Sequence, residues 1–328
     1  MWFHSCPGWS TRTCRAACLA AALAGSSPVL PAPGETIATF TRNRTNPILR
    51  GVRIGAEIAA TAYGAQAVHY IPRSEAPSEQ LALVDELIVN KPDALVLVPY
   101  DPKAMLAAVD RLNAAGIPVT NVSERLAGGS VVSFVGTDDY QLALSSARYL
   151  MNALAGKGNV VILEGPDNLA GSVARVRGYK DALEGFPAIK LLASKSANYA
   201  RASAVDVMKS LLRSYPQIDG ILAANDQMAI GAIAQLKRAN RHALVIGMNA
   251  SREAIELIKS GDLLGSGDYD GFLQGCLGVE IALRNLRKQA VPKELMLKPV
   301  VVDKTSYRPY ELAMEQRSCP SLESITGN

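Results

Sequence analysis

Polar residues follow several short apolar runs in this sequence, at the points where predicted strands give way to loops or helices. In the clearest case the apolar run Ile221–Ala224 leads through Asn225 and Asp226 into the helical pattern Gln227–Lys237. Asp226 occupies the position of a helix N-cap, where a carboxylate accepts hydrogen bonds from the free amides of the first turn. Asn225 is left at the carboxyl end of the strand, with an amide that both donates and accepts. A capped turn with a solvated asparagine is the simpler alternative for this stretch taken alone.

The same arrangement recurs along the chain, and ligands of open α/β sheets bind at the carboxyl ends of strands. The candidate ligand-binding residues are Arg42, Asn46, Ser123, Glu124, Arg175, Tyr199, Asn225, Asn249 and Asp268. Further polar residues at such ends are Tyr100, Asp101, Arg125, Asp167, Asn168 and Asp270. Carboxylates accept hydrogen bonds, a guanidinium donates them as a fork, and amides do both, so the set suits a ligand with many hydroxyl groups. For any single member, an ordinary polar loop is the simpler explanation.

Residue patterns typical of catalysis are missing from the sequence. There is no Gly-x-Ser-x-Gly motif, and no phosphate-binding glycine loop lies between a strand and a helix. Beyond the N-terminal segment only His69 and His242 remain, too few for a histidine triad or a zinc site. The adjacent acids Asp138 and Asp139 stand at a helix start, where capping explains them. The sequence therefore predicts a binding protein without a cofactor or metal, and not an enzyme.

The elements that must position these residues follow an alternating order. From Thr36 onward, short β-rich runs alternate with amphipathic helical runs, as expected for βα units around a parallel sheet. The stretches Asp93–Met105 and Asp219–Ile230 resemble each other, which indicates two lobes of like topology facing a common cleft; chance similarity is the alternative. We expect an α/β fold with two doubly wound lobes. The last strand is predicted at Lys298–Val302, directly after the helix Phe272–Arg287, and the tail beyond Tyr307 shows no periodicity.

The N-terminus has the features of a secretory signal. Arg12 and Arg15 precede the apolar run Ala16–Ala24, which is followed by small residues. This pattern predicts a signal peptide over 1–24, cleaved between 24 and 33; a disordered cytosolic N-terminus is the alternative. Without those two arginines the formal charge falls from +4 to +2. A chain so near neutrality, with no basic run, is not expected to bind nucleic acid.

Two cysteines, Cys276 and Cys319, lie beyond the N-terminal segment. An oxidising compartment would permit one disulfide between them. Against that, Cys276 shares a helical face with Phe272, Val279 and Leu283, which favours a buried, unpaired thiol.

Taken together, these stretches resemble the periplasmic sugar-binding proteins of ABC transporters, of the ribose-binding type, also called type I periplasmic binding proteins. The likeness runs from about Thr36 to Asp303. It is carried by Asn46-Pro47, Leu163–Gly165, Ser172–Gly178, Ala224–Ala232, Gly247–Asn249, Ser251–Ala254 and Ile258–Gly261.

The resemblance implies two Rossmann-like lobes joined by three hinge strands, with residues 36–137 plus 269–297 in the first lobe and 138–268 plus 298–328 in the second. It also implies that the lobes close on a ligand. Position for position, Asn46, Arg175, Tyr199 and Asn225 match ligand contacts of the family. Arg175 corresponds to the arginine that forks onto sugar hydroxyls.

Several positions depart from the family pattern. Ile48 and Leu49 stand where two phenylalanines commonly sandwich the sugar ring, and Ser123-Glu124 stands where Asp-Arg is usual. Asn249 replaces an aspartate, Asp268 a glutamine, and Arg42 a small polar residue.

The resemblance thus implies a monomeric periplasmic protein that captures a pentose, hexose or polyol and delivers it to an ABC permease in the inner membrane. The pair Arg42 and Arg175 leaves a sugar acid open. A signalling receptor of the same fold, and less readily a sugar-responsive transcription regulator, are the alternatives.

Overall fold

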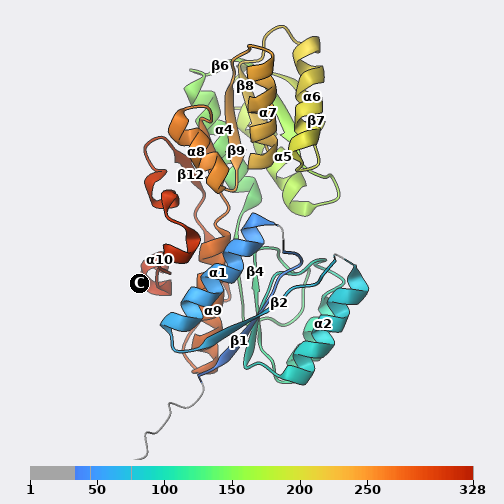
Figure 1. Cartoon of the computed structure of the whole chain (residues 1–328), viewed down its shortest axis with the longest axis vertical. Helices are drawn as coiled ribbons and strands as arrows, with labels where there is room; N and C mark the ends of the chain where they lie inside the picture. Colours follow the sequence, from blue (N-terminus) through green and yellow to red (C-terminus); the bar gives the residue numbers. More distant parts are fainter. Residues whose placement is uncertain (1–33, 45, 75, 328) are drawn as a thin grey trace, which may run out of the picture. The chain divides into compact units, whose positions relative to one another are not determined.

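Two β-sheets with helices on their faces form the framework of the protein (Figure 1). The computed structural model describes residues 34–44, 46–74 and 76–327. Within these residues the first sheet has the order β11-β5-β4-β3-β1-β2 and the second the order β12-β10-β9-β8-β6-β7. All strand pairs are parallel except β10 with β12. This arrangement confirms the predicted α/β fold with two doubly wound lobes.

The strands are short. The first sheet contains β1 (Thr36–Phe40), β2 (Gln66–Tyr70), β3 (Ala94–Leu97), β4 (Val119–Val122), β5 (Ser133–Thr137) and β11 (Glu294–Leu297). The second contains β6 (Lys157–Glu164), β7 (Ala188–Ser196), β8 (Gly220–Ala223), β9 (Leu244–Met248), β10 (Gly265–Asp268) and β12 (Val300–Asp303).

Each sheet carries its own helices. The first lobe has α1 (Pro47–Ala62), α2 (Pro77–Asn90), α3 (Leu106–Ala114) and α9 (Gly271–Leu286). The second has α4 (Asp139–Ala153), α5 (Ala170–Leu183), α6 (Arg201–Ser214), α7 (Asp226–Arg238) and α8 (Arg252–Ser260).

Alternation of side chains along β3 builds two cores in the first lobe. Val96 packs among residues of α1 and α9, whereas Leu95 and Leu97 pack on the opposite face with α2 and α3. All four residues of β3 are fully buried, so the strand can be apolar throughout.

Helices α1 and α9 approach each other through their glycines. A Cβ atom on Gly275 would lie 2.0 Å from the Val52 carbonyl oxygen, and one on Gly55 would lie 2.1 Å from that of Phe272. Only glycine at these two positions allows the backbones of the two helices to come this close. The packing holds the first turn of α1 beside the start of α9, where the chain has just left the second sheet.

The chain passes between the sheets after β5, after β10 and after β11. Thr137, at the end of β5, donates its hydroxyl to the backbone oxygen of Tyr269, just after β10, over 2.9 Å. Gln274 Nε2 donates to the same oxygen over 2.5 Å. Two of the three crossing segments are therefore held together by buried hydrogen bonds.

The sequence did not predict β11, and the strand predicted at Lys298–Val302 is β12, two residues further on. Strand β11 pairs with β5 at the edge of the first sheet. Because it is an edge strand, its side chains alternate only weakly between exposed and buried positions. Three short elements follow β12: η1 (Arg308–Glu311), η2 (Met314–Gln316) and α10 (Leu322–Thr326).

The tail departs from the prediction in two ways. It was assigned to the second lobe as a whole, but η2 packs against α1 and α10 packs against α9, both in the first lobe. Cys276 is buried, as predicted, but it forms a disulfide with Cys319, with 5.5 Å between the Cα atoms. The expectation of an unpaired thiol was wrong, because a helical face reports burial and carries no information on a partner distant in sequence.

The predicted signal peptide lies outside the described residues. Among the helices of the described part of the chain, none combines the length and the apolar character needed to cross a bilayer.

Candidate ligand-binding site

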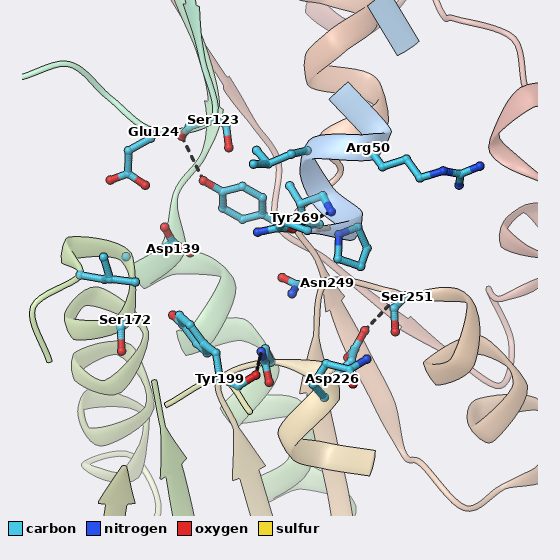
Figure 2. A pocket seen from close by; sticks show the side chains of 18 of the residues that line it. Arg50, Ser123, Glu124, Asp139, Ser172, Tyr199, Asp226, Asn249, Ser251 and Tyr269 are labelled. Carbon is cyan, nitrogen blue, oxygen red and sulfur yellow. Dashed lines mark hydrogen bonds between the residues drawn. The ribbon is translucent and has the colours of Figure 1, made fainter. Parts of the chain in front are cut away.

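A cavity of about 410 Å³ lies at the carboxyl ends of the strands and is lined by residues of both lobes (Figure 2). From the first lobe come Arg42, Asn46, Pro47, Ile48, Leu49, Arg50, Ser123 and Glu124. From the second come Asp139, Leu169, Gly171, Ser172, Arg175, Tyr199, Asn225, Asp226, Gln227, Asn249, Ser251 and Arg252, with Tyr269 from a crossing segment and Met314 from the tail. All of the candidate ligand-binding residues named from the sequence lie in this lining except Asp268. The further polar residues named at strand ends do not line the cavity: Tyr100, Asp101, Arg125, Asp167, Asn168 and Asp270.

Arg175 is a buried charge on α5, fixed by its neighbours. Its Nε donates to Asp139 Oδ1 over 2.6 Å and its Nη1 to the Ala224 carbonyl oxygen over 2.7 Å. Burial acts to lower the pKa of Arg175, but the charge and hydrogen bond of Asp139, together with the neighbouring Tyr199 and Tyr269, outweigh it and raise the pKa, so the guanidinium stays charged. Its Nη2 makes no hydrogen bond to any residue that the structure describes, which leaves that donor for a ligand.

Two tyrosine rings flank this guanidinium. The Arg175 Cζ atom lies 5.9 Å from the ring centroid of Tyr199 and 5.2 Å from that of Tyr269, within the range of cation–π contacts. The Tyr269 hydroxyl donates to the Ser123 carbonyl oxygen over 3.0 Å, so this ring joins the crossing segment to the first lobe (Figure 2). Burial raises the pKa of both phenols, which keeps them neutral donors.

Asn225 is the N-cap of α7, the role that the sequence assigned to Asp226. Its Oδ1 accepts from the Met228 amide over 2.9 Å, and its Nδ2 donates to the Tyr199 carbonyl oxygen over 3.0 Å. The helix begins one residue earlier than predicted, because β8 ends at Ala223. An amide can make about four hydrogen bonds, so Asn225 keeps one donor and one acceptor position beyond these two.

Asp226 is instead a buried residue that joins three elements. Its carboxylate accepts from Ser266 Oγ over 2.6 Å and from the Ser251 amide over 2.7 Å. Burial raises the pKa of Asp226 to about 6. This residue fixes the start of α7 against β10 and the start of α8.

Asn249 follows β9 in an unusual conformation, with φ of 112°. Asparagine tolerates positive φ better than most residues do. The backbone N–H of Asn249 donates to the Gly267 carbonyl oxygen over 2.6 Å. The Asn249 side chain points into the cavity (Figure 2). The Arg175 contact to its Oδ1 is long, at 3.5 Å.

The first lobe contributes a carboxylate that has no partner of its own. Glu124 is half-buried and makes no hydrogen bond through its side chain to any residue of the described chain. Burial raises the pKa of Glu124, whereas Arg42 and Arg175 act to lower it. Ser123, with φ of 67°, turns the chain here so that Glu124 faces the cavity (Figure 2).

The α1 side of the cavity is mainly apolar. Asn46 caps α1, since its Oδ1 accepts from the Ile48 amide over 2.9 Å. Ile48 and Leu49 line the cavity directly after it. This wall can make aliphatic contacts with a ligand, but it provides no aromatic ring for a sugar to stack on.

Asp268 does not line this cavity. Its Oδ2 accepts from the Tyr310 hydroxyl over 2.5 Å and its Oδ1 from the Asp270 amide over 2.8 Å, beside a smaller neighbouring cavity. Burial and the nearby Asp270 raise the pKa of Asp268. Successive residues at the end of a strand point in opposite directions, so Tyr269 faces the main cavity and Asp268 does not. Asp270 has a left-handed backbone, with φ of 48°, and its Oδ1 accepts from the Leu273 amide as the cap of α9.

The sequence analysis also missed Asp139, Ser172, Tyr269 and Met314 as lining residues. Tyr269 could have been found from the alternation with Asp268, once that neighbour was placed. Asp139 follows the true cap of α4, Asp138, and only tertiary packing brings it to Arg175. Within the described residues there is no cluster of three or more side chains suited to hold a metal ion.

The chain matches the family described as "periplasmic binding protein domain" over residues 37–290. It is 34% identical over 207 residues to a xylitol-binding protein of Mycolicibacterium smegmatis, covering 62% of this chain and 59% of that protein, which is less than two thirds of its length. It is 33% identical over 229 residues to a D-apiose import binding protein of Paraburkholderia graminis, covering 69% and 73%. With a ribose import binding protein of Haemophilus influenzae it shares 28% identity over 261 residues, covering 80% and 89%.

Solved structures show the same fold. A periplasmic solute-binding protein of an ABC transporter from Actinobacillus succinogenes, with bound D-allose, has a TM-score of 0.79 and 32% identity, covering 84% of this chain and 100% of that chain. An ABC transporter solute-binding protein from Mycobacterium smegmatis, with bound glycerol, has a TM-score of 0.75 and 25% identity, covering 88% of this chain and 99% of that chain. These relatives are binding proteins for sugars or polyols.

Proposed function

The chain belongs to the periplasmic binding protein family, and we propose that it captures a small carbohydrate, either a pentose, a hexose or a polyol, between its two lobes. The observation that carries this proposal is the cavity of about 410 Å³ that is lined from both lobes by oriented hydrogen-bonding groups. The named ligands of its relatives, among them xylitol, D-apiose, ribose and D-allose, support the same class of ligand.

The groups available in the cavity complement hydroxyls in both directions. Arg175 Nη2 donates, the Glu124 carboxylate accepts, and the amides of Asn225 and Asn249 supply both functions. A ligand that lacks a matching hydroxyl leaves one of these groups buried without a partner, which costs about 1–3 kcal/mol. We assign ligand contacts to Arg42, Asn46, Ser123, Glu124, Arg175, Tyr199, Asn225 and Asn249, and none to Asp268.

Binding then acts by closing the lobes about the crossing segments. A ligand held by both lobes favours the closed arrangement, because only there are all of its hydroxyls paired. No bond is made or broken, so the protein is not an enzyme. We propose that it works as a monomer in the periplasm and delivers its ligand to an ABC permease.

A thermal-shift screen of the mature chain against pentoses, hexoses, polyols, sugar acids, amino acids and purines tests the proposal. At 100 times its dissociation constant a ligand adds about 2.7 kcal/mol to the free energy of unfolding. We expect at least one carbohydrate to raise the melting temperature. A rise with amino acids or purines alone would refute the ligand class.

A further inference from the structure

The C-terminal tail begins on the second lobe. After β12, the Tyr310 hydroxyl donates to Asp268 Oδ2 over 2.5 Å. Lys259 of α8 pairs with Glu311 over 2.5 Å. Element η1 is thus held against α8 and the end of β10.

Four residues after Glu311 the tail is attached to the first lobe. Glu315 pairs with Arg50 of α1, and Cys319 is joined to Cys276 of α9 by the disulfide. Further on, the Leu322 amide donates to the Glu280 carboxylate of α9 over 2.9 Å. The tail is therefore a fourth passage of the chain between the lobes, in addition to the three crossing segments. The disulfide of Cys319 anchors it covalently to the first lobe.

Met314 lies at the start of the part attached to the first lobe, and it belongs to the lining of the main cavity. Its Sδ atom lies 3.6 Å from the position of a Cβ on Gly51, so the side chain rests directly on α1. It extends the apolar wall made by Ile48 and Leu49. A thioether is flexible and polarisable, and it packs well against the C–H groups of a ligand.

We propose that Met314 contacts the bound ligand and helps to set its selectivity, and that the Cys276–Cys319 disulfide is the anchor that positions it. This proposal rests on the proposed function, since it assigns an apolar contact to the same cavity. The wall from the second lobe forms hydrogen bonds with hydroxyl groups of the ligand. Met314 therefore favours ligands that present C–H groups on the side facing α1. The disulfide acts through Met314, because it is the covalent attachment of the tail nearest to that residue. Further along, the tail is also held by the buried Leu322 side chain and by the hydrogen bond of the Leu322 amide to Glu280.

The test is a calorimetric titration of the mature protein with the carbohydrate that gives the largest thermal shift. Met314→Ala should raise the dissociation constant about tenfold, since it removes three apolar heavy atoms from the wall. Leu312→Ala is the matched control: this tail residue is 52% exposed, lies outside the cavity lining, and should leave the constant within about twofold. Equal constants for the two variants would overturn the proposal, whereas a wild-type protein that binds no carbohydrate would instead refute the proposed function.

A double-mutant cycle tests the anchor. The Cys276→Ala/Cys319→Ala variant should weaken binding, and adding Met314→Ala to it should cost much less than in the wild type, because the two changes act on one contact. Fully additive losses would show that the disulfide does not position Met314. Thermal melts followed by circular dichroism check that each variant is folded at the titration temperature. If the cysteine variant does not fold, Met314→Ala in the disulfide-bonded protein still tests the ligand contact on its own.

Discussion

Arg175 carries a buried positive charge that its surroundings hold in one orientation. Asp139 neutralises it, a backbone carbonyl fixes one nitrogen, and two tyrosine rings limit its movement. Because these contacts already hold the guanidinium in one orientation, it loses little side-chain entropy when it binds a ligand. The sequence indicated Arg175 as a candidate ligand contact, and the structure places it in the cavity lining. Its partner Asp139 lies 36 positions away and could not be inferred from local pattern.

Arg175→Lys should weaken carbohydrate binding about 30-fold or more, a loss of about 2 kcal/mol, because an ammonium keeps the charge and loses the planar fork. Calorimetric titration measures the change. Arg177→Lys on the same helix is the control, since Arg177 is exposed and lies outside the cavity lining; it should bind like the wild type. Unchanged affinity in Arg175→Lys would remove this residue from the site.

Glu124 predicts a pH dependence of binding. Its ionised carboxylate is the form that accepts hydrogen bonds without competition, and burial raises the pKa of Glu124 above its ordinary value despite the nearby Arg42 and Arg175. Affinity should therefore be full at pH values above this raised pKa and fall as the pH drops through it. We expect the affinity to fall progressively as the pH is lowered from about 8 to about 5.

Titrations across that range check the effect. In Glu124→Gln the side chain does not titrate, so the affinity should be lower at high pH and nearly constant over the range. A pH profile that is the same in the variant and the wild type would assign the dependence to another group.

At the scale of elements, the packing of α1 on α9 determines where the first-lobe wall of the cavity lies. Strands and helices were predicted closely wherever periodicity was strong: α9 spans Gly271–Leu286, against a predicted helix Phe272–Arg287. The misses have local causes: β11 is a short edge strand, and Asn225 and Asp226 are both good caps, so pattern alone could not choose between them. The path of the tail depends on a disulfide between residues 43 positions apart, which no periodicity reveals.

Gly275→Ala should lower the free energy of unfolding by about 2 kcal/mol or more. Alanine is favoured over glycine in a helix by about 1 kcal/mol, but the new Cβ would lie 2.0 Å from the Val52 carbonyl oxygen, and α1 would have to move. Chemical denaturation measures the difference. Gly128→Ala, where no atom lies within 4 Å of the added Cβ, should change stability by less than about 0.5 kcal/mol. Equal stabilities of the two variants would contradict the close approach of the helices.

At the scale of the whole molecule, the two lobes supply complementary parts of one site. The second lobe contributes a charged and amide-rich wall, and the first contributes the carboxylate of Glu124 and an apolar surface. Repetition between Asp93–Met105 and Asp219–Ile230 was enough to predict two like lobes, because topology repeats with sequence pattern. The side chains that each lobe directs at the ligand could be predicted only in part. Their orientation depends on backbone alternation, as at Tyr269, and on tertiary partners, as at Asp139.

The central claim is that a carbohydrate binds between the lobes, and a crystal structure of the mature protein with the carbohydrate of largest thermal shift tests it most directly. The account predicts one ligand whose hydroxyls lie within hydrogen-bond distance of Arg175 and Asn225 of the second lobe and of Glu124 of the first. A ligand bound outside the cavity, or held by one lobe alone, would contradict it.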